Sequence, residues 1–104
     1  MAKSEKKLIR ERFRNTCLKR DGYKCKMCEI KTVEYPDVHH ITDRTLMING
    51  GYVRENGISL CPTCHLLAEQ FHTTGTAVQG YSPQDLYLKI GSGYEKAVKA
   101  SEKL

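Results

Sequence analysis

Two cysteine pairs of identical spacing constrain this 104-residue chain more than any other feature. Cys25 and Cys28 form one Cys-x-x-Cys pair, Cys61 and Cys64 form the other, and 32 residues separate the pairs. Two intervening residues let both thiolates of a pair bind the same ion from a tight turn, so four thiolates predict a closed, tetrahedral zinc site. Redox-active pairs and buried free thiols are the alternatives. The commonest zinc ribbons separate their pairs by about 15–20 residues, so we expect an insertion here.

A structural metal fits the small size of the chain. With 104 residues, 39% of them apolar and no Trp, we expect one domain with a modest hydrophobic core. A bound ion contributes folding energy that such a core lacks. The fifth cysteine, Cys17, falls on the apolar stripe of a predicted helix, and we interpret it as a small buried hydrophobe.

Hydropathy and charge exclude several classes of protein. No stretch of 18 apolar residues predicts a transmembrane helix, and residues 1–7 lack the apolar core of a secretory signal. An odd number of cysteines without such a signal indicates reduced thiols, so we expect a cytoplasmic protein that does not bind membranes. Residues 1–31 carry eleven Lys/Arg against four Asp/Glu, a net charge of +7, whereas the remainder carries six against eight, or −2.

The hydrophobic pattern divides the expected single domain, residues 1–104, into three parts. Residues 1–20 form a basic segment in which 4–20 predict a helix, its apolar stripe made of Leu8, Ile9, Phe13, Cys17 and Leu18. Residues 21–72 hold β-favouring residues at 33–41, a short apolar run at 57–60 and a helical pattern at 65–72. Residues 73–104 form a loop and a helical tail, which begins at Ser82-Pro83 and is divided near Gly91.

All four histidines lie in the middle part, at positions 39, 40, 65 and 72. Four thiolates already fill a zinc ion, so these imidazoles need another role. Neutral imidazole is a common metal ligand and a general base near neutral pH, whereas an isolated histidine is more often an ordinary surface or core residue. His39 and His40 point to opposite sides of a regular strand, so a bulge or turn is needed for both to face one site.

The order of these residues resembles the HNH endonuclease family. The resemblance is carried by Asp37-Val-His-His-Ile41 and Asn56-Gly-Ile-Ser-Leu-Cys-Pro-Thr-Cys-His65, extends upstream to Leu18–Cys25, and covers about residues 10–72. The tail is similar to that of small phage-type members. The resemblance implies an α+β fold: a ββα-metal (His-Me finger) core with a four-Cys zinc site, flanked by the N-terminal basic helix and the C-terminal helices. Its hairpin carries His39 and His40 on the first strand, and its helix starts near His65.

The resemblance also implies residue roles. His40 matches the general base that activates water, His39 and His65 match ligands of a catalytic divalent ion, and Asn56 matches the residue that holds the base through backbone hydrogen bonds. For the third ligand we favour Glu69, four residues after His65, as ligand or supporting residue; His72 is the alternative, and a solvated charge is the ordinary interpretation of Glu69. A mixed nitrogen and oxygen site suits Mg²⁺, Mn²⁺, Ni²⁺ or Zn²⁺.

These expectations add up to a metal-dependent DNA endonuclease that nicks with low sequence specificity, in the cytoplasm of a bacterial or phage-infected cell. The candidate phosphate-binding residues are the basic ones around the first Cys pair: Arg10, Arg12, Arg14, Lys19, Arg20, Lys24 and Lys26. A solvated helix face is the other interpretation of this run. The alternative function is a non-catalytic, zinc-ribbon-like nucleic-acid-binding module. A larger protein, such as a phage packaging motor, is a candidate partner for the tail.

Overall fold

The computed structural model describes residues 3–30 and 35–104 and contains one long helix, a two-stranded ribbon and three shorter helices. In chain order these are α1 (Lys3–Arg20), β1 (Asp37–His40), β2 (Gly57–Leu60), α2 (Pro62–Thr74), α3 (Pro83–Lys89) and α4 (Tyr94–Glu102). Three 3-10 turns, η1 (Arg44–Leu46), η2 (Ile48–Gly51) and η3 (Arg54–Asn56), lie in the inter-strand loop, residues 41–56. The predicted α+β class is confirmed. Residues 33 and 34 of the predicted strand lie outside the described residues.

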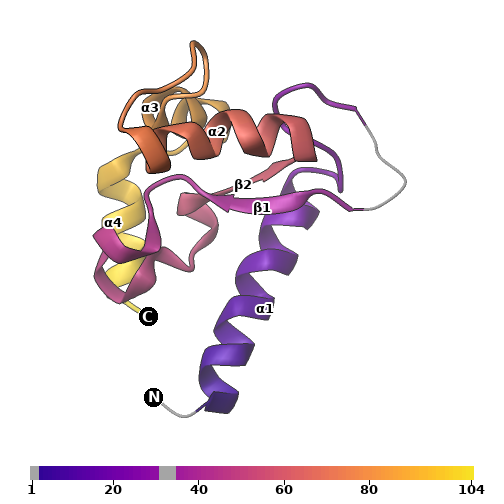
Figure 1. The fold of residues 1–104 in the computed structure, drawn as a ribbon. Helices are drawn as coiled ribbons and strands as arrows, with labels where there is room; N and C mark the ends of the chain where they lie inside the picture. Colours follow the sequence, from indigo (N-terminus) through magenta and orange to yellow (C-terminus); the bar gives the residue numbers. More distant parts are fainter. Residues whose placement is uncertain (1–2, 31–34) are drawn as a thin grey trace.

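The ribbon is the central layer of the fold, with α1 against one face and α2 against the other (Figure 1). Its strands are antiparallel, and the register places Asp37 opposite Leu60 and His40 opposite Gly57. All four residues of β2 are buried, because helices cover both faces of the ribbon. The strand β1 is less covered and alternates, with His39 buried and its neighbours Val38 and His40 partly exposed.

Helix α1 contacts the ribbon only through its C-terminal half. Phe13, Cys17 and Leu18 are buried, whereas Leu8 is 59% exposed, so the predicted apolar stripe is wrong at that position. The N-terminal half of α1 extends beyond the ribbon (Figure 1), and there the guanidinium of Arg10 lies over the ring of Tyr52, 5.8 Å from its centroid. The close approach depends on Gly57, because a Cβ atom at this position would lie 2.6 Å from both Cys17 Sγ and Phe13 Cε1.

The end of α1 is hydrogen-bonded to β2. The Arg20 guanidinium donates to both carboxylate oxygens of Asp21, at 2.8 and 2.9 Å, and to the carbonyls of Arg54 and Gly57, each at 2.6 Å. Asp21 in turn accepts from the backbone N–H of Ser59 at 2.9 Å. This network fixes the helix end beside the ribbon and leads the chain into the first Cys pair.

Helix α2 begins at Pro62, three residues before the predicted start at His65. Cys61 is the N-cap: its Sγ accepts from the Cys64 N–H, and Pro62 occupies the first turn, where a missing N–H costs nothing. The helix ends at Thr74, and its C-cap Gly75 adopts the left-handed conformation at φ 79°. Because the second Cys pair caps the helix, the same residues set both the start of α2 and the position of the thiols.

The tail folds back over the inter-strand loop. Ser82 and Asp85 form a capping box at the start of α3, and the predicted division near Gly91 separates α3 from α4. The core joins α3 and α4 to the ribbon through Ile41, Ile58, Leu60, Leu86, Tyr87 and Ala97. In the described part of the chain no helix has the length and apolar character to cross a membrane.

Candidate functional site

The four cysteines of the two pairs lie together at the junction of the α1–β1 segment with the start of α2. One ligand atom from each lies within 4.8 Å of all the others, and the Sγ atoms of Cys28 and Cys61 are 3.7 Å apart. Cys25, Cys61 and Cys64 are buried and belong to the hydrophobic core, and none of the thiols forms a disulfide. Four sulfur donors at this spacing could hold a tetrahedral zinc ion.

The surroundings of Cys25 favour a thiolate. Burial raises the pKa of this thiol, but the backbone N–H groups of Cys28, Cys61 and Met27 stabilise the anion and bring its pKa down to about 7. Burial, and the neighbouring thiols of Cys61 and Cys25, raise the pKa of Cys64 to about 12, so without a cation the four thiols do not all ionise beside one another. A divalent cation removes this conflict, because a coordinated thiol loses its proton. The donor set therefore fits zinc.

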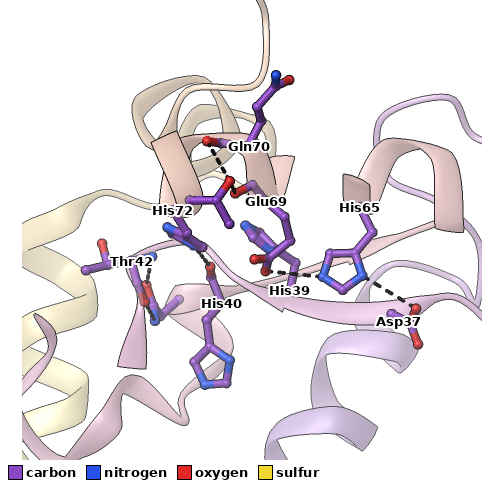
Figure 2. Close-up of polar contacts among 10 residues, drawn as sticks. Asp37, His39, His40, Thr42, His65, Glu69, Gln70 and His72 are labelled. Atoms are coloured by element: carbon purple, nitrogen blue, oxygen red, sulfur yellow. Dashed lines mark hydrogen bonds and ion pairs between the residues drawn. The ribbon is translucent and has the colours of Figure 1, made fainter. Parts of the chain in front are cut away.

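A second cluster joins β1 to the exposed side of α2. His39 comes from β1, and His65 and Glu69 lie one turn apart on α2, so that Oε1 of Glu69 is 3.2 Å from His39 Nδ1 and 3.5 Å from His65 Nε2 (Figure 2). One ligand atom from each residue lies within 4.8 Å of the other two. The structure thus brings together the three predicted ligands of the catalytic ion, including Glu69.

His39 has the features of a metal ligand. Its side chain is 1% exposed, and both of its ring nitrogens are buried without a hydrogen-bond partner. Burial, together with the neighbouring histidines His72, His65 and His40, lowers its pKa to about 3, so the imidazole is neutral and keeps a free lone pair. Buried polar atoms without partners are rare, and a cation shared with His65 and Glu69 would give one of the two nitrogens of His39 a partner.

Asp37 adds a carboxylate that the sequence analysis did not single out. Its Oδ2 lies 3.5 Å from Nδ1 of His65, on the opposite side of the ring from Glu69 (Figure 2). A carboxylate at Nδ1 favours the tautomer that leaves Nε2 free for a metal. Only the structure reveals the contact of Asp37 with His65, because in the sequence Asp37 is one of several acidic residues near the His-His pair.

His72, the alternative third ligand, lies beside the cluster without joining it. Its ring stacks on that of His39, with centroids 5.0 Å apart and planes 21° from parallel. Its Nε2 is 2.9 Å from the carbonyl oxygen of His40, so this nitrogen donates a hydrogen bond to the backbone of β1. The geometry therefore places His72 as a support for the strand that carries both histidines.

His40 lies on the opposite face of β1 from the cluster. No bulge interrupts the register, and the side chain points away from His39, His65 and Glu69 (Figure 2). It packs between Phe13 of α1 and Tyr52, with ring centroids 4.6 and 4.7 Å away. Burial lowers the pKa of His40 to about 4, so the imidazole is neutral at pH 7.

Asn56 is fully buried and binds the backbone just after His40. Its Oδ1 accepts from the N–H of Thr42 at 3.0 Å, while Nδ2 donates to the carbonyls of Thr42 at 3.1 Å and Gly51 at 3.2 Å. Gly51 makes room for this amide, because it has φ 69° and a Cβ there would lie 2.5 Å from Nδ2. Asn56 thus holds both ends of the inter-strand loop.

The basic residues predicted to bind DNA, which all lie within residues 1–31, have different environments. Arg10 and Arg14 line an open groove of about 440 Å³ that also contains Tyr52, Asp37 and His65. Arg12 faces a separate hollow. Lys19 and Lys24 are exposed, and Lys26 is partly buried. Arg20 is the exception among the predicted DNA contacts, because its guanidinium is already engaged by Asp21 and two carbonyls.

Comparison with known proteins gives one match. Residues 25–70, which include both Cys pairs, His39, His40, Asn56, His65 and Glu69, match the family model described as HNH endonuclease. Neither a curated protein nor a solved structure matches the chain significantly. The four clustered cysteines and the second cluster therefore lie inside the matched residues, whereas α1, α3 and α4 lie outside them.

Proposed function

From the premise that residues 25–70 are an HNH endonuclease domain, we propose that this chain is a metal-dependent DNA endonuclease that nicks duplex DNA with low sequence specificity. The observation that carries the proposal is the meeting of His39, His65 and Glu69 at one point, inside the matched residues. Three donors leave coordination positions for water and substrate, which is the property that separates a catalytic site from a structural one.

The proposed chemistry is hydrolysis of a phosphodiester bond. His40 is the general base: its neutral imidazole takes the proton of the attacking water. His39, His65 and Glu69 hold a divalent ion, Mg²⁺, Mn²⁺, Ni²⁺ or Zn²⁺, and when bound this ion supplies positive charge that stabilises the phosphate and the leaving oxygen. Asp37 and His72 orient His65 and β1, and Asn56 keeps His40 in place.

The opposed directions of His39 and His40 suit this reaction. In an in-line displacement, the attacking and leaving oxygens lie on opposite sides of the phosphorus atom. A base on one face of β1 and an ion on the other can serve the two oxygens of a phosphate that lies across the strand. The regular alternation of β1 is therefore compatible with catalysis, and the bulge expected for a shared site is not needed.

The groove beside His65 supports a DNA substrate. Arg10 and Arg14 line it, and the exposed Lys19 and Lys24 and the partly buried Lys26 add positive charge near the first Cys pair. Contacts of this kind bind phosphates irrespective of sequence and weaken as salt rises. Arg20 is left out of the proposed DNA contacts, because it stabilises the end of α1. A packaging-motor partner, a phage origin and a cytoplasmic location stay predictions from the sequence.

The test is nicking of supercoiled plasmid with Mg²⁺, Mn²⁺, Ni²⁺ or EDTA, using wild type and His40→Ala. We expect the wild type to nick with a divalent ion and to be inactive in EDTA, and His40→Ala to bind DNA without nicking. Equal folding of both proteins, by circular dichroism, excludes loss of structure as the cause. Binding without nicking under every metal by the wild type would contradict the proposal and favour the non-catalytic binding module.

A further inference from the structure

We propose that Tyr87 is a positioning residue of the nuclease site, although it lies in α3, outside the matched residues 25–70. The inference rests on the proposed function. Tyr87 acts through Asn56 and Thr42, which hold the chain immediately after His40. The nuclease unit then extends beyond the family domain into the tail.

The hydroxyl of Tyr87 reaches the centre of the inter-strand loop. Tyr87 is 4% exposed, and its hydroxyl donates to Oδ1 of Asn56 at 2.6 Å. The same oxygen lies 2.7 Å from Oγ1 of Thr42. A phenol has one proton to donate, and Tyr87 donates it to Asn56. The Thr42 hydroxyl is therefore the donor in the second hydrogen bond, and the Tyr87 oxygen accepts. One side chain of α3 therefore binds both Asn56 and Thr42, the two residues whose hydrogen bonds close the inter-strand loop; we call this pair the loop clamp.

This contact completes the hydrogen bonds of Asn56. The Nδ2 group uses its two N–H donors on the carbonyls of Thr42 and Gly51. Oδ1 accepts from the Thr42 N–H and from Tyr87, so both donors and both acceptor positions of the amide are used. Removal of the Tyr87 hydroxyl leaves Oδ1 with one donor and Thr42 Oγ1 without its acceptor. The amide then loses the contact that comes from outside the loop.

The path from this clamp to His40 is short. Thr42 follows His40 by two residues, and both of its backbone polar groups are bound by the Asn56 side chain. Between them, the Ile41 N–H donates to the Asn56 carbonyl at 2.9 Å, which continues the pairing of β1 beyond His40. A small shift of Thr42 therefore moves the end of β1, and a misplacement of about 1 Å can cost up to ~100-fold in rate.

A purely structural role is the competing explanation, because the ring of Tyr87 is part of the hydrophobic core. The substitution Tyr87→Phe separates the two roles, since it keeps the ring and removes only the hydroxyl. Tyr94→Phe is the matched control: Tyr94 is 54% exposed, and its hydroxyl makes no hydrogen bond within the described residues. The same atom is deleted in both variants, but only the Tyr87 hydroxyl is hydrogen-bonded to the inter-strand loop.

The first arm of the experiment measures nicking by both variants and the wild type. We expect Tyr87→Phe to lower kcat by about tenfold with KM, zinc content and circular dichroism unchanged, and Tyr94→Phe to match the wild type. A wild-type kcat in Tyr87→Phe would overturn the inference. So would a loss of activity that follows a loss of zinc or of helix, because that result assigns Tyr87 to folding alone.

The second arm does not depend on activity. In ¹H–¹³C spectra of the imidazole groups, we expect the His40 signal to shift in Tyr87→Phe and to stay in place in Tyr94→Phe. An unmoved His40 signal would contradict the positioning role whether or not the wild type cuts DNA. A wild type that never nicks, with a shifted His40 signal, would instead contradict only the proposed function.

A double-mutant cycle tests the route through Thr42. Thr42→Val removes the hydroxyl that donates to Tyr87 and leaves the backbone contacts to Asn56 intact. If the two residues act through one network, the double variant loses less kcat than the product of the two single losses. Fully multiplicative losses would show that Tyr87 and Thr42 act independently, and would contradict this route.

Discussion

The two ligand clusters of this chain differ in burial, donor count and place in the fold. The four cysteines belong mostly to the core, with Cys25, Cys61 and Cys64 no more than 8% exposed, and they offer four donors of one kind. The cluster of His39, His65 and Glu69 offers three mixed donors, and the side chains of His65 and Glu69 are 30% and 43% exposed. Only His39 is buried.

If the proposed function holds, this difference assigns folding stability and reactivity to neighbouring residues of one helix. Helix α2 carries Cys64 toward the core and His65, the next residue, toward the groove. A closed four-donor site has no position for a substrate, whereas an open three-donor site gains little folding energy from its ion. We therefore expect changes at the first cluster to affect folding and changes at the second to affect reactivity.

The largest expected effect is that of Cys61→Ser. This variant should lose zinc and its cooperative fold, because structural zinc contributes on the order of 10 kcal/mol and domains of this size are stable by about 5–15 kcal/mol. Zinc content per chain and thermal unfolding by circular dichroism check this. Cys17→Ala is the control and should keep its zinc. A Cys61→Ser protein with full zinc content and normal unfolding would break the comparison.

His65→Ala should have the next largest effect, and on activity alone. We expect it to keep zinc and helix content, to lose binding of Mn²⁺ measured by calorimetry, and to nick at least about 100-fold more slowly. Leu66→Ala changes the neighbouring residue of α2, which is 74% exposed, and should resemble the wild type. Unfolding of His65→Ala to the extent of Cys61→Ser would show that the two clusters share one role.

Gly51→Ala tests the loop between the two strands, with a smaller expected effect. The added Cβ would meet Asn56 Nδ2 at 2.5 Å on a backbone with φ 69°, so we expect a loss of about 1–3 kcal/mol in urea unfolding and slower nicking, with zinc retained. Gly80→Ala is the matched control, because Gly80 has φ 87° and nothing lies within 4 Å of its Cβ position. Equal losses in both variants would assign the effect to backbone strain alone.

The smallest expected effect concerns the fifth cysteine. Burial raises the pKa of Cys17 to about 12, so this thiol should not react with Ellman's reagent in the folded protein. All five thiols should react after unfolding in EDTA. Rapid labelling of Cys17 in the zinc-loaded protein, located by mass spectrometry, would show that α1 does not seal the ribbon.

Local sequence signals predict much of this molecule. The Cys spacing predicts that four thiols meet, because each pair lies in a single turn. The period of residues 4–20 predicts α1, and Ser82-Pro83 predicts the start of α3 through its capping box. In each case the signal is a spacing between residues that lie close together in the sequence.

The features that sequence could not give depend on contacts distant along the chain. In the sequence, Arg20 is one basic residue among many. In the structure its guanidinium donates to the carbonyl of Gly57, 37 residues away. The sequence predicts Tyr87 only as an apolar position of a helix. Its proposed positioning role depends on a hydrogen bond to Asn56, 31 residues away. Leu8 follows the helical period, but the ribbon does not extend beneath it. Periodicity indicates which face is apolar and says nothing of how far the partner surface extends.

Because side chains alternate along β1, the register of its pairing with β2 decides which histidine faces α2 and which faces α1. The two side chains are chemically the same, and a slip of one residue in the pairing with β2 would exchange their faces, so that His40 met Glu69 and His39 met Phe13. A ribbon whose two strands have four residues each resists such a slip only weakly by itself. A deletion of one residue in the inter-strand loop could therefore leave every letter of the motif intact and still produce an inert protein. For a short ribbon, the spacing between the motif residues matters as much to the proposed site as the residues themselves.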